Sequence, residues 1–208
     1  PDDYISKYGA DTLRMYLMFT GPFMEGGDFR DEGVVGITRF LGRVTKLSER
    51  VRNYNDTLSS PRLLHQTIKK VTDDVESLHY NTAISALMIL ANDFESKEVL
   101  SVSEYAMFLM LLAPFAPYLS EELWSLLFAD QKSMIYSSKS ESGPTSYPQT
   151  FSKKNSIHLQ PWPKYDSKLI EDDMFILVIQ VNGKVRGKVR ALKIITETEA
   201  IDLAQKQI

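Results

Sequence analysis

The sequence predicts a mainly α-helical protein, an antiparallel helical bundle followed by a small, truncated α+β domain with a β-hairpin. Three observations predict this architecture. Apolar residues recur at helical spacing through most of residues 1–128, this periodicity stops over 129–156, and a strand-like region at 175–191 contains a central Asn-Gly pair. The chain has 208 residues, of which 43% are hydrophobic, enough for one large domain with an appendage.

Two short helices are predicted at the start of the chain. Asp2 or Asp3 can cap the first, and Gly9 can end it, because glycine tolerates the left-handed backbone that often follows a helix. Asp11 can cap the second, over residues 12–19. The glycines and the proline that follow predict a loop before the next helix.

A long helix is predicted from about residue 32 to residue 54, with Asp31 as its cap. One face is apolar, formed by Ile37, Phe40, Leu41, Val44, Leu47 and Val51. The opposite side carries a row of cations in an arc about 60° wide, namely Arg39, Arg43, Lys46 and Arg50. Such a row is typical of an ordinary solvated face, but it also suits a phosphate backbone, since Lys and Arg neutralise phosphates and release counterions. The residues alone leave both interpretations open.

Further helices complete the predicted bundle. One begins at the Ser-Pro pair 60–61, because proline suits the first helical position. Another covers about 81–94, and an apolar stretch over 103–128 is interrupted at Pro114 and Pro117. We predict that the bundle occupies residues 31–165.

No catalytic constellation is evident. Ser120 can cap the helix after the prolines, which places Glu121 and Glu122 in a first turn, where the helix dipole favours acidic residues. Beside Trp124 this pair resembles two catalytic acids, but the dipole explains it more simply. Asp28, Asp31 and Glu32 cluster as well, and capping and loop roles account for them. We therefore predict no catalytic residues in the chain.

Residues 129–156 are rich in Ser, Lys, Gln, Gly and Pro, which predicts a flexible insertion. An extended connector follows, with Trp162 between two prolines. Residues 175–181 are continuously apolar, which predicts a strand buried on both faces. Asn182-Gly183 predicts a tight turn into a second strand over 184–191.

The second strand carries a cation at every other position, Lys184, Arg186, Lys188 and Arg190. Regular strand alternation predicts that all four share one face. A soluble edge strand and a polyanion-binding face both explain this pattern. A capping box at Thr196 and Glu199 predicts a last helix over 197–208. The small domain, 166–208, is expected to be incomplete, because a hairpin with one helix is marginal on its own.

Composition excludes several classes of site. The chain has no cysteine, which excludes disulfides and thiolate metal ligands, and its three histidines are scattered, so no metal site is predicted. The net charge is −3, so any nucleic-acid contact must come from local patches. No apolar run reaches the ~20 residues that span a bilayer. The opening Pro1, with no initiator Met, suggests a piece of a longer protein.

Several motifs resemble one family of enzymes. Residues 8–14, Tyr-Gly-Ala-Asp-Thr-Leu-Arg, resemble the segment that follows the Lys-Met-Ser-Lys-Ser loop of class I aminoacyl-tRNA synthetases. Residues 80–86, Tyr-Asn-Thr-Ala-Ile-Ser-Ala, and 181–188, Val-Asn-Gly-Lys-Val-Arg-Gly-Lys, resemble bacterial-type leucyl-tRNA synthetases more specifically. The Leu-Ala-Pro-Phe-Ala-Pro run at 112–117 and the Leu-Gln-Pro-Trp-Pro run at 159–163 agree in order and spacing.

The resemblance implies a noncatalytic, tRNA-binding part of a leucine–tRNA ligase. Residues 1–30 would end the stem-contact region, 31–165 would form the anticodon-binding bundle, and 166–208 would begin the C-terminal domain. The expected partners are leucine tRNA and the upstream catalytic and editing domains, with no membrane, in a monomeric parent that uses ATP and Mg. The resemblance implies the bacterial cytoplasm, and an organelle stays open.

The candidate tRNA-contacting residues are the two cation rows described above. Two alternatives stay open from the sequence. One is the same region of an isoleucine or valine enzyme, because the run at 8–14 is shared by those relatives. The other is a helical protein-interaction scaffold without an RNA role, whose binding would not weaken with salt, because apolar interfaces release no counterions.

Overall fold

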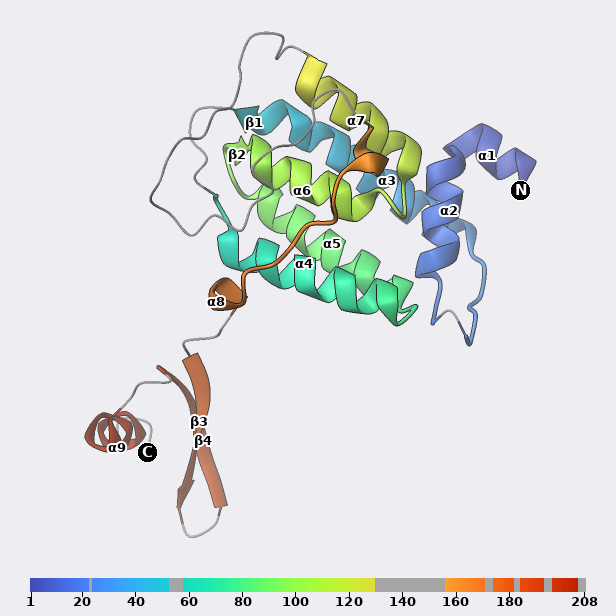
Figure 1. The fold of residues 1–208 in the computed structure, drawn as a ribbon. Helices are drawn as coiled ribbons and strands as arrows, with labels where there is room; N and C mark the ends of the chain where they lie inside the picture. Colours follow the sequence, from blue (N-terminus) through green and yellow to red (C-terminus); the bar gives the residue numbers. More distant parts are fainter. Residues whose placement is uncertain are drawn as a thin grey trace. The chain divides into compact units, whose positions relative to one another are not determined.

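The computed structural model describes residues 1–22, 24–52, 58–129, 156–170, 174–181, 184–192 and 196–205 (Figure 1). The chain divides into two compact units, Pro1–Leu169 and Ile170–Ile208. The first is helical and the second contains an antiparallel hairpin, so the predicted fold class is confirmed. The boundary lies close to the predicted one at 165–166, and the separation of 1–30 from 31–165 stays a prediction. The predicted insertion lies almost wholly outside the described residues.

In its described residues, the first unit contains seven longer helices (Figure 1): α1 (Asp2–Tyr8), α2 (Ala10–Phe19), α3 (Asp31–Leu47), α4 (Pro61–Glu76), α5 (Tyr80–Glu95), α6 (Val102–Leu112) and α7 (Pro117–Ala129). Two helices begin with clear local signals, of which the sequence predicted the first. Pro61 occupies the first turn of α4, and Ser101 and Glu104 form a reciprocal capping box at the start of α6. None of the described helices has the length and apolar character needed to cross a membrane.

Helix α6 is the centre of the bundle. Every residue from Glu104 to Leu112 is buried, as expected for a helix that is apolar on all sides. The apolar face of α3 packs into the same core through Ile37, Phe40 and Val44. The hydroxyl of Tyr105 donates to the carbonyl oxygen of Val44 at 2.9 Å, which ties α6 to α3 across the core. This packing fixes α3, and with it the cations on the other side of that helix.

The long helix is shorter than predicted. Helix α3 ends at Leu47, and the chain continues as the 3₁₀ turn η1 (Ser48–Arg50) and the short strand β1 (Val51–Arg52). Strand β1 pairs in parallel with β2 (Leu100–Ser101), directly before α6. The prediction of a helix to residue 54 is therefore wrong, because partners from a distant part of the chain replace the helical hydrogen bonds. Residue 54 itself lies outside the described residues.

The predicted cap at Asp11 is also wrong. Helix α2 begins at Ala10, directly after Gly9, whose φ of 88° confirms its role as a helix terminator. The Asp11 carboxylate is buried and accepts from the backbone N–H groups of Leu119 at 2.7 Å and Tyr118 at 3.4 Å. Both donors lie in the first turn of α7, so Asp11 caps a helix more than 100 residues away in sequence.

Helix α7 begins at Pro117 and not at Ser120, the predicted cap. The Ser120 hydroxyl is buried and has no hydrogen-bond partner within the described part of the chain. Like Asp11, Glu121 binds an element other than its own helix. Its carboxylate accepts hydrogen bonds from the Ser156 hydroxyl at 2.7 Å and from the Ile157 N–H at 3.0 Å. These bonds hold the turn η2 (Ile157–Leu159) against α7.

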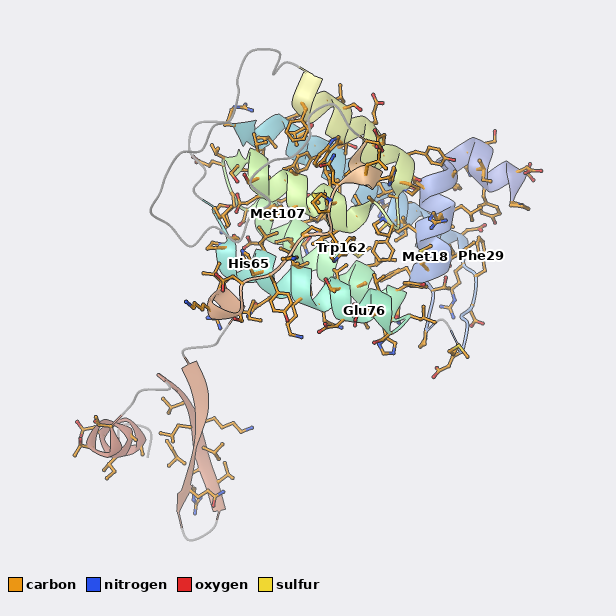
Figure 2. All side chains as sticks on the ribbon, in the orientation of Figure 1. Met18, Phe29, His65, Glu76, Met107 and Trp162 are labelled. Carbon is orange, nitrogen blue, oxygen red and sulfur yellow. The ribbon has the colours of Figure 1, made fainter. Side chains whose placement is uncertain are left out.

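The connector that follows η2 runs across α4 toward the short helix α8 (Ser167–Ile170). Trp162 Nε1 donates to the Thr72 hydroxyl at 2.8 Å, and the Asp166 N–H donates to Nδ1 of His65 at 2.8 Å. Figure 2 labels Trp162 and His65 among these side chains. The extended connector predicted from its prolines is therefore tied to the bundle by side chains of α4.

The second unit consists of β3 (Met174–Val181), β4 (Lys184–Leu192) and α9 (Glu197–Gln205). Both strands confirm the predicted hairpin, although its Asn-Gly turn lies outside the described residues. Ile179 is buried, but Val178 is 44% exposed. The prediction that this strand is buried on both faces is therefore wrong, because in the described residues of this unit a single helix accompanies the hairpin.

Candidate nucleic-acid interface

The predicted cation row on the bundle comprises two different kinds of residue. Arg39 and Lys46 are exposed on α3, and neither has a hydrogen-bond or ion-pair partner in the described ranges. The apolar side of α3 is fixed in the core, so these two cations stand on a rigid helix. Unpartnered cations of this kind are available to phosphate oxygens.

Arg43 is half-buried and already has partners on α5. Its Nε lies 2.6 Å from Oε1 of Glu95, and its terminal nitrogen donates to the side-chain oxygen of Asn92. Each member of the Arg43–Glu95 ion pair keeps somewhat more than a third of its side chain exposed. The pair therefore joins α3 to α5 and remains within reach of solvent.

Arg50 is engaged at the C-terminal end of α5. Its guanidinium donates to the backbone carbonyls of Glu95 and Lys97, the latter at 2.9 Å. These carbonyls have no partners within the helix, and a cation there also complements the helix dipole. The prediction of four solvent-facing cations is therefore only partly correct, because Arg43 and Arg50 are partly buried against α5, which lies beside this side of α3. Their contact with nucleic acid stays a prediction.

The cation row on the hairpin is divided by a β-bulge. Ile179 pairs with Gly187, whereas the next residue, Gln180, pairs with Val185. Arg186 is thus an extra residue on β4, and its side chain is exposed. A single extra residue shifts the alternation of the strand by one position.

This shift places the cations at register positions of both faces. Lys188 pairs with Val178, and Lys184 pairs with Val181, three residues further along β3. Residues opposite each other share a face, and positions three apart on a strand lie on different faces. The prediction that all four cations share one face is therefore wrong. Lys188 is exposed, and so is its register partner Val178.

Sequence reasoning missed the acidic and amide partners of the bundle cations. Glu95 and Asn92 lie about 50 residues from Arg43, and no short-range pattern connects them. The N-terminal motif at 8–14 is likewise structural, since Asp11 caps α7 and Arg14 donates from Nε and a terminal nitrogen to the Pro114 carbonyl, at 3.2 and 3.1 Å. In the described ranges, no group of three or more His, Asp or Glu side chains could hold a metal ion.

The chain is similar to known proteins over nearly its whole length. The family model described as the anticodon-binding domain of tRNA ligase matches residues 62–201. A leucine–tRNA ligase of Leptospira biflexa is 38% identical over 213 residues, which cover 99% of this chain and 22% of that protein. A leucine–tRNA ligase of Dehalococcoides mccartyi is 38% identical over 218 residues, which cover 98% of this chain and 24% of that protein.

A solved structure agrees with these relatives. The LeuRS–tRNA–LeuAMS ternary complex of Agrobacterium radiobacter K84 contains a chain that matches with a TM-score of 0.69 and 26% sequence identity. The match covers 98% of this chain and 26% of that one. The chain thus spans about a quarter of the length of the proteins it matches.

Proposed function

We propose that this chain, which belongs to the anticodon-binding domain family of tRNA ligases, is the tRNA-positioning part of a leucine–tRNA ligase. In this role it holds the body of leucine tRNA and carries out no chemistry itself. Activation of leucine with ATP and Mg, transfer to tRNA and editing belong, in this proposal, to other domains of such a ligase. The similarity to leucine–tRNA ligases over 99% of the chain supports the choice of leucine.

The single observation that carries the proposal is the exposure of cations on both α3 and β4. Arg39 and Lys46 are exposed on α3, a helix whose other side is buried in the core. Arg186 and Lys188 are exposed on β4. Cations with this exposure suit phosphate oxygens, which give affinity and orientation without reading bases. Because the net charge of the chain is −3, attraction of a polyanion must come from local groups of cations such as these.

The experiment is a binding titration of leucine tRNA and a non-cognate tRNA across a salt series. We compare the unaltered chain with R39E/K46E and with R186E/K188E. Each double variant is expected to weaken binding and to reduce the slope of log affinity against log salt, by about one for each phosphate that the variant no longer neutralises. Preference for leucine tRNA would also distinguish the chain from the corresponding region of an isoleucine or valine enzyme.

The matched control is K164E/K168E, which makes the same change in net charge at two exposed lysines of the connector and α8. It should reduce affinity less than either test variant and leave the salt slope nearly unchanged. If both test variants bind like this control, the proposed contacts are wrong. Binding that does not weaken with salt would instead favour an apolar protein-interaction scaffold.

A further inference from the structure

Glu95 contacts the candidate interface on the bundle through both its side chain and its backbone. Its carboxylate pairs with Arg43 at 2.6 Å, while its backbone carbonyl accepts from Arg50. A single residue at the end of α5 therefore engages two of the four cations that were predicted to bind phosphate on the bundle. The ion pair is partly exposed, so a ligand that reaches Arg43 also meets the carboxylate.

We propose that Glu95 is a specificity-determining residue, one that competes with tRNA phosphate for Arg43 and so limits non-specific RNA binding. The inference rests on the proposed function, because it concerns the same surface. A phosphate at Arg43 must displace the Glu95 carboxylate or bear its repulsion. Displacing the carboxylate costs binding free energy. Only an RNA that also contacts Arg39 and Lys46 gains enough binding free energy from those contacts to offset this cost.

The geometry favours replacement of the Glu95 carboxylate by a phosphate at Arg43, rather than a carboxylate that simply blocks access to Arg43. The amide of Asn92 holds the other end of the guanidinium, so Arg43 stays in place when the carboxylate is removed. Two further cations lie on the same helix without partners in the described parts of the chain, Arg39 at four residues and Lys46 at three residues from Arg43. A phosphate backbone that follows α3 would therefore meet Arg43 between two available charges.

The test is E95Q in the 208-residue chain, with binding to leucine tRNA and to a non-cognate tRNA measured across a salt series. Glutamine keeps the shape of the side chain and removes its charge. We expect about two- to fivefold tighter binding at low salt, in line with the strength of an exposed ion pair. The salt slope should steepen by about one, and the gain should be larger for non-cognate tRNA.

The matched control is E98Q, which removes the same charge from an exposed glutamate three residues away. It should change affinity and slope less than E95Q does. Adding R43Q to E95Q should abolish the gain, because the released guanidinium is its source. Thermal unfolding of each variant checks that the bundle remains folded at the binding temperature.

Each result decides between named alternatives. If E95Q binds like E98Q while R39E/K46E weakens binding, the interface is real and the role given to Glu95 is wrong. If the gain from E95Q persists with R43Q, competition for Arg43 is wrong. If R39E/K46E also has no effect, or the unaltered chain does not bind tRNA at low salt, the proposed function of this surface is overturned and the inference with it.

Discussion

At the scale of single residues, the carboxylate of Glu104 is fully buried in α6 and joins two helices through its hydrogen bonds. One oxygen accepts from the N–H and hydroxyl of Ser59 and from the N–H of Ser60, at 2.6 to 2.9 Å. The other accepts from the N–H of Ser101 at 3.1 Å. The carboxylate thus accepts hydrogen bonds from backbone N–H groups just before α4 and from the capping residue of its own helix.

Replacing Glu104 with glutamine should lower the free energy of unfolding by about 1.5–3 kcal/mol, the range for hydrogen bonds to a charged group. The amide places donors opposite backbone donors, and E104A should lower stability further by leaving several N–H groups unpaired. Urea denaturation measures both changes. E76Q, the same change at an exposed glutamate labelled in Figure 2, should stay within about 0.5 kcal/mol of the unaltered chain. Equal effects of E104Q and E76Q would contradict this role.

His65 gives a pH dependence with a definite sign. Burial lowers the pKa of His65 below its ordinary value of 6.5, and the nearby Asp166 carboxylate opposes this shift only in part. The unfolded chain therefore binds a proton more readily than the folded one. Stability from the neutral imidazole is complete above pH 6.5 and falls as the pH drops from there to the folded pKa, by at most about 1.4 kcal/mol per pH unit.

We expect H65Q to lose this pH-dependent component, because glutamine keeps an acceptor for the Asp166 N–H without titrating. Urea titrations at a series of pH values measure the change in slope. The control is H79Q, which makes the same replacement at a largely exposed histidine. An unchanged slope in H65Q would show that another group produces the acid sensitivity.

At the scale of elements, α7 depends on α2 for its N-terminal cap. Asp11 accepts two of the first N–H groups of α7, and Arg14 donates to the carbonyl of Pro114 in the turn before it. We expect D11A to lower the free energy of unfolding by about 0.5–2 kcal/mol, the range for replacing a helix-capping residue with alanine. Thermal unfolding measures this loss, and D2A is the control because Asp2 is exposed. Equal melting temperatures would contradict the cap.

The same elements show which parts of the fold the sequence could predict. Pro61 and Gly9 act through their own backbones, so short-range patterns placed them correctly. Asp11 and Glu121 act through side chains on distant elements, whereas the local rules made Asp11 the cap of its own helix and gave Glu121 a role in the dipole of its own helix. The end of α3 at Leu47 could not be predicted either. The residues that follow it form hydrogen bonds with Lys97 and with strand β2, which lie far away in the sequence.

The candidate site was predictable in its residue types and not in its geometry. Spacing alone placed Arg39 and Lys46 correctly on the solvent side of α3. It could not foresee that α5 would bring Glu95 to Arg43, a contact between residues 52 apart. On β4, alternation assumed a regular strand, and the extra residue Arg186 broke it. The spacing of residues in a sequence does not specify which distant residues become neighbours, or where a strand contains a bulge.

At the scale of the whole molecule, the family resemblance predicted from a few short motifs is confirmed, since the anticodon-binding domain model matches residues 62–201. Those motifs differ in what they do. The run at 8–14 holds the turn before α7, whereas the run at 181–188 includes the first half of β4, which carries exposed cations. A motif that identifies a family can therefore have a structural role, whereas nucleic-acid contact by the run at 181–188 stays a proposal.

The two compact units give the last prediction, because each has its own packing. The bundle has a large core centred on α6, whereas the second unit rests on one hairpin and one helix, an arrangement that is marginally stable. We expect L87A, at a fully buried position of α5, to lower the stability of the bundle by about 2–5 kcal/mol. Amide hydrogen exchange should then accelerate in α3 to α6 and stay unchanged in β3 and β4. Because local opening draws only on the contacts of the unit that opens, faster exchange in the hairpin of L87A would mean that the two units unfold as one cooperative block.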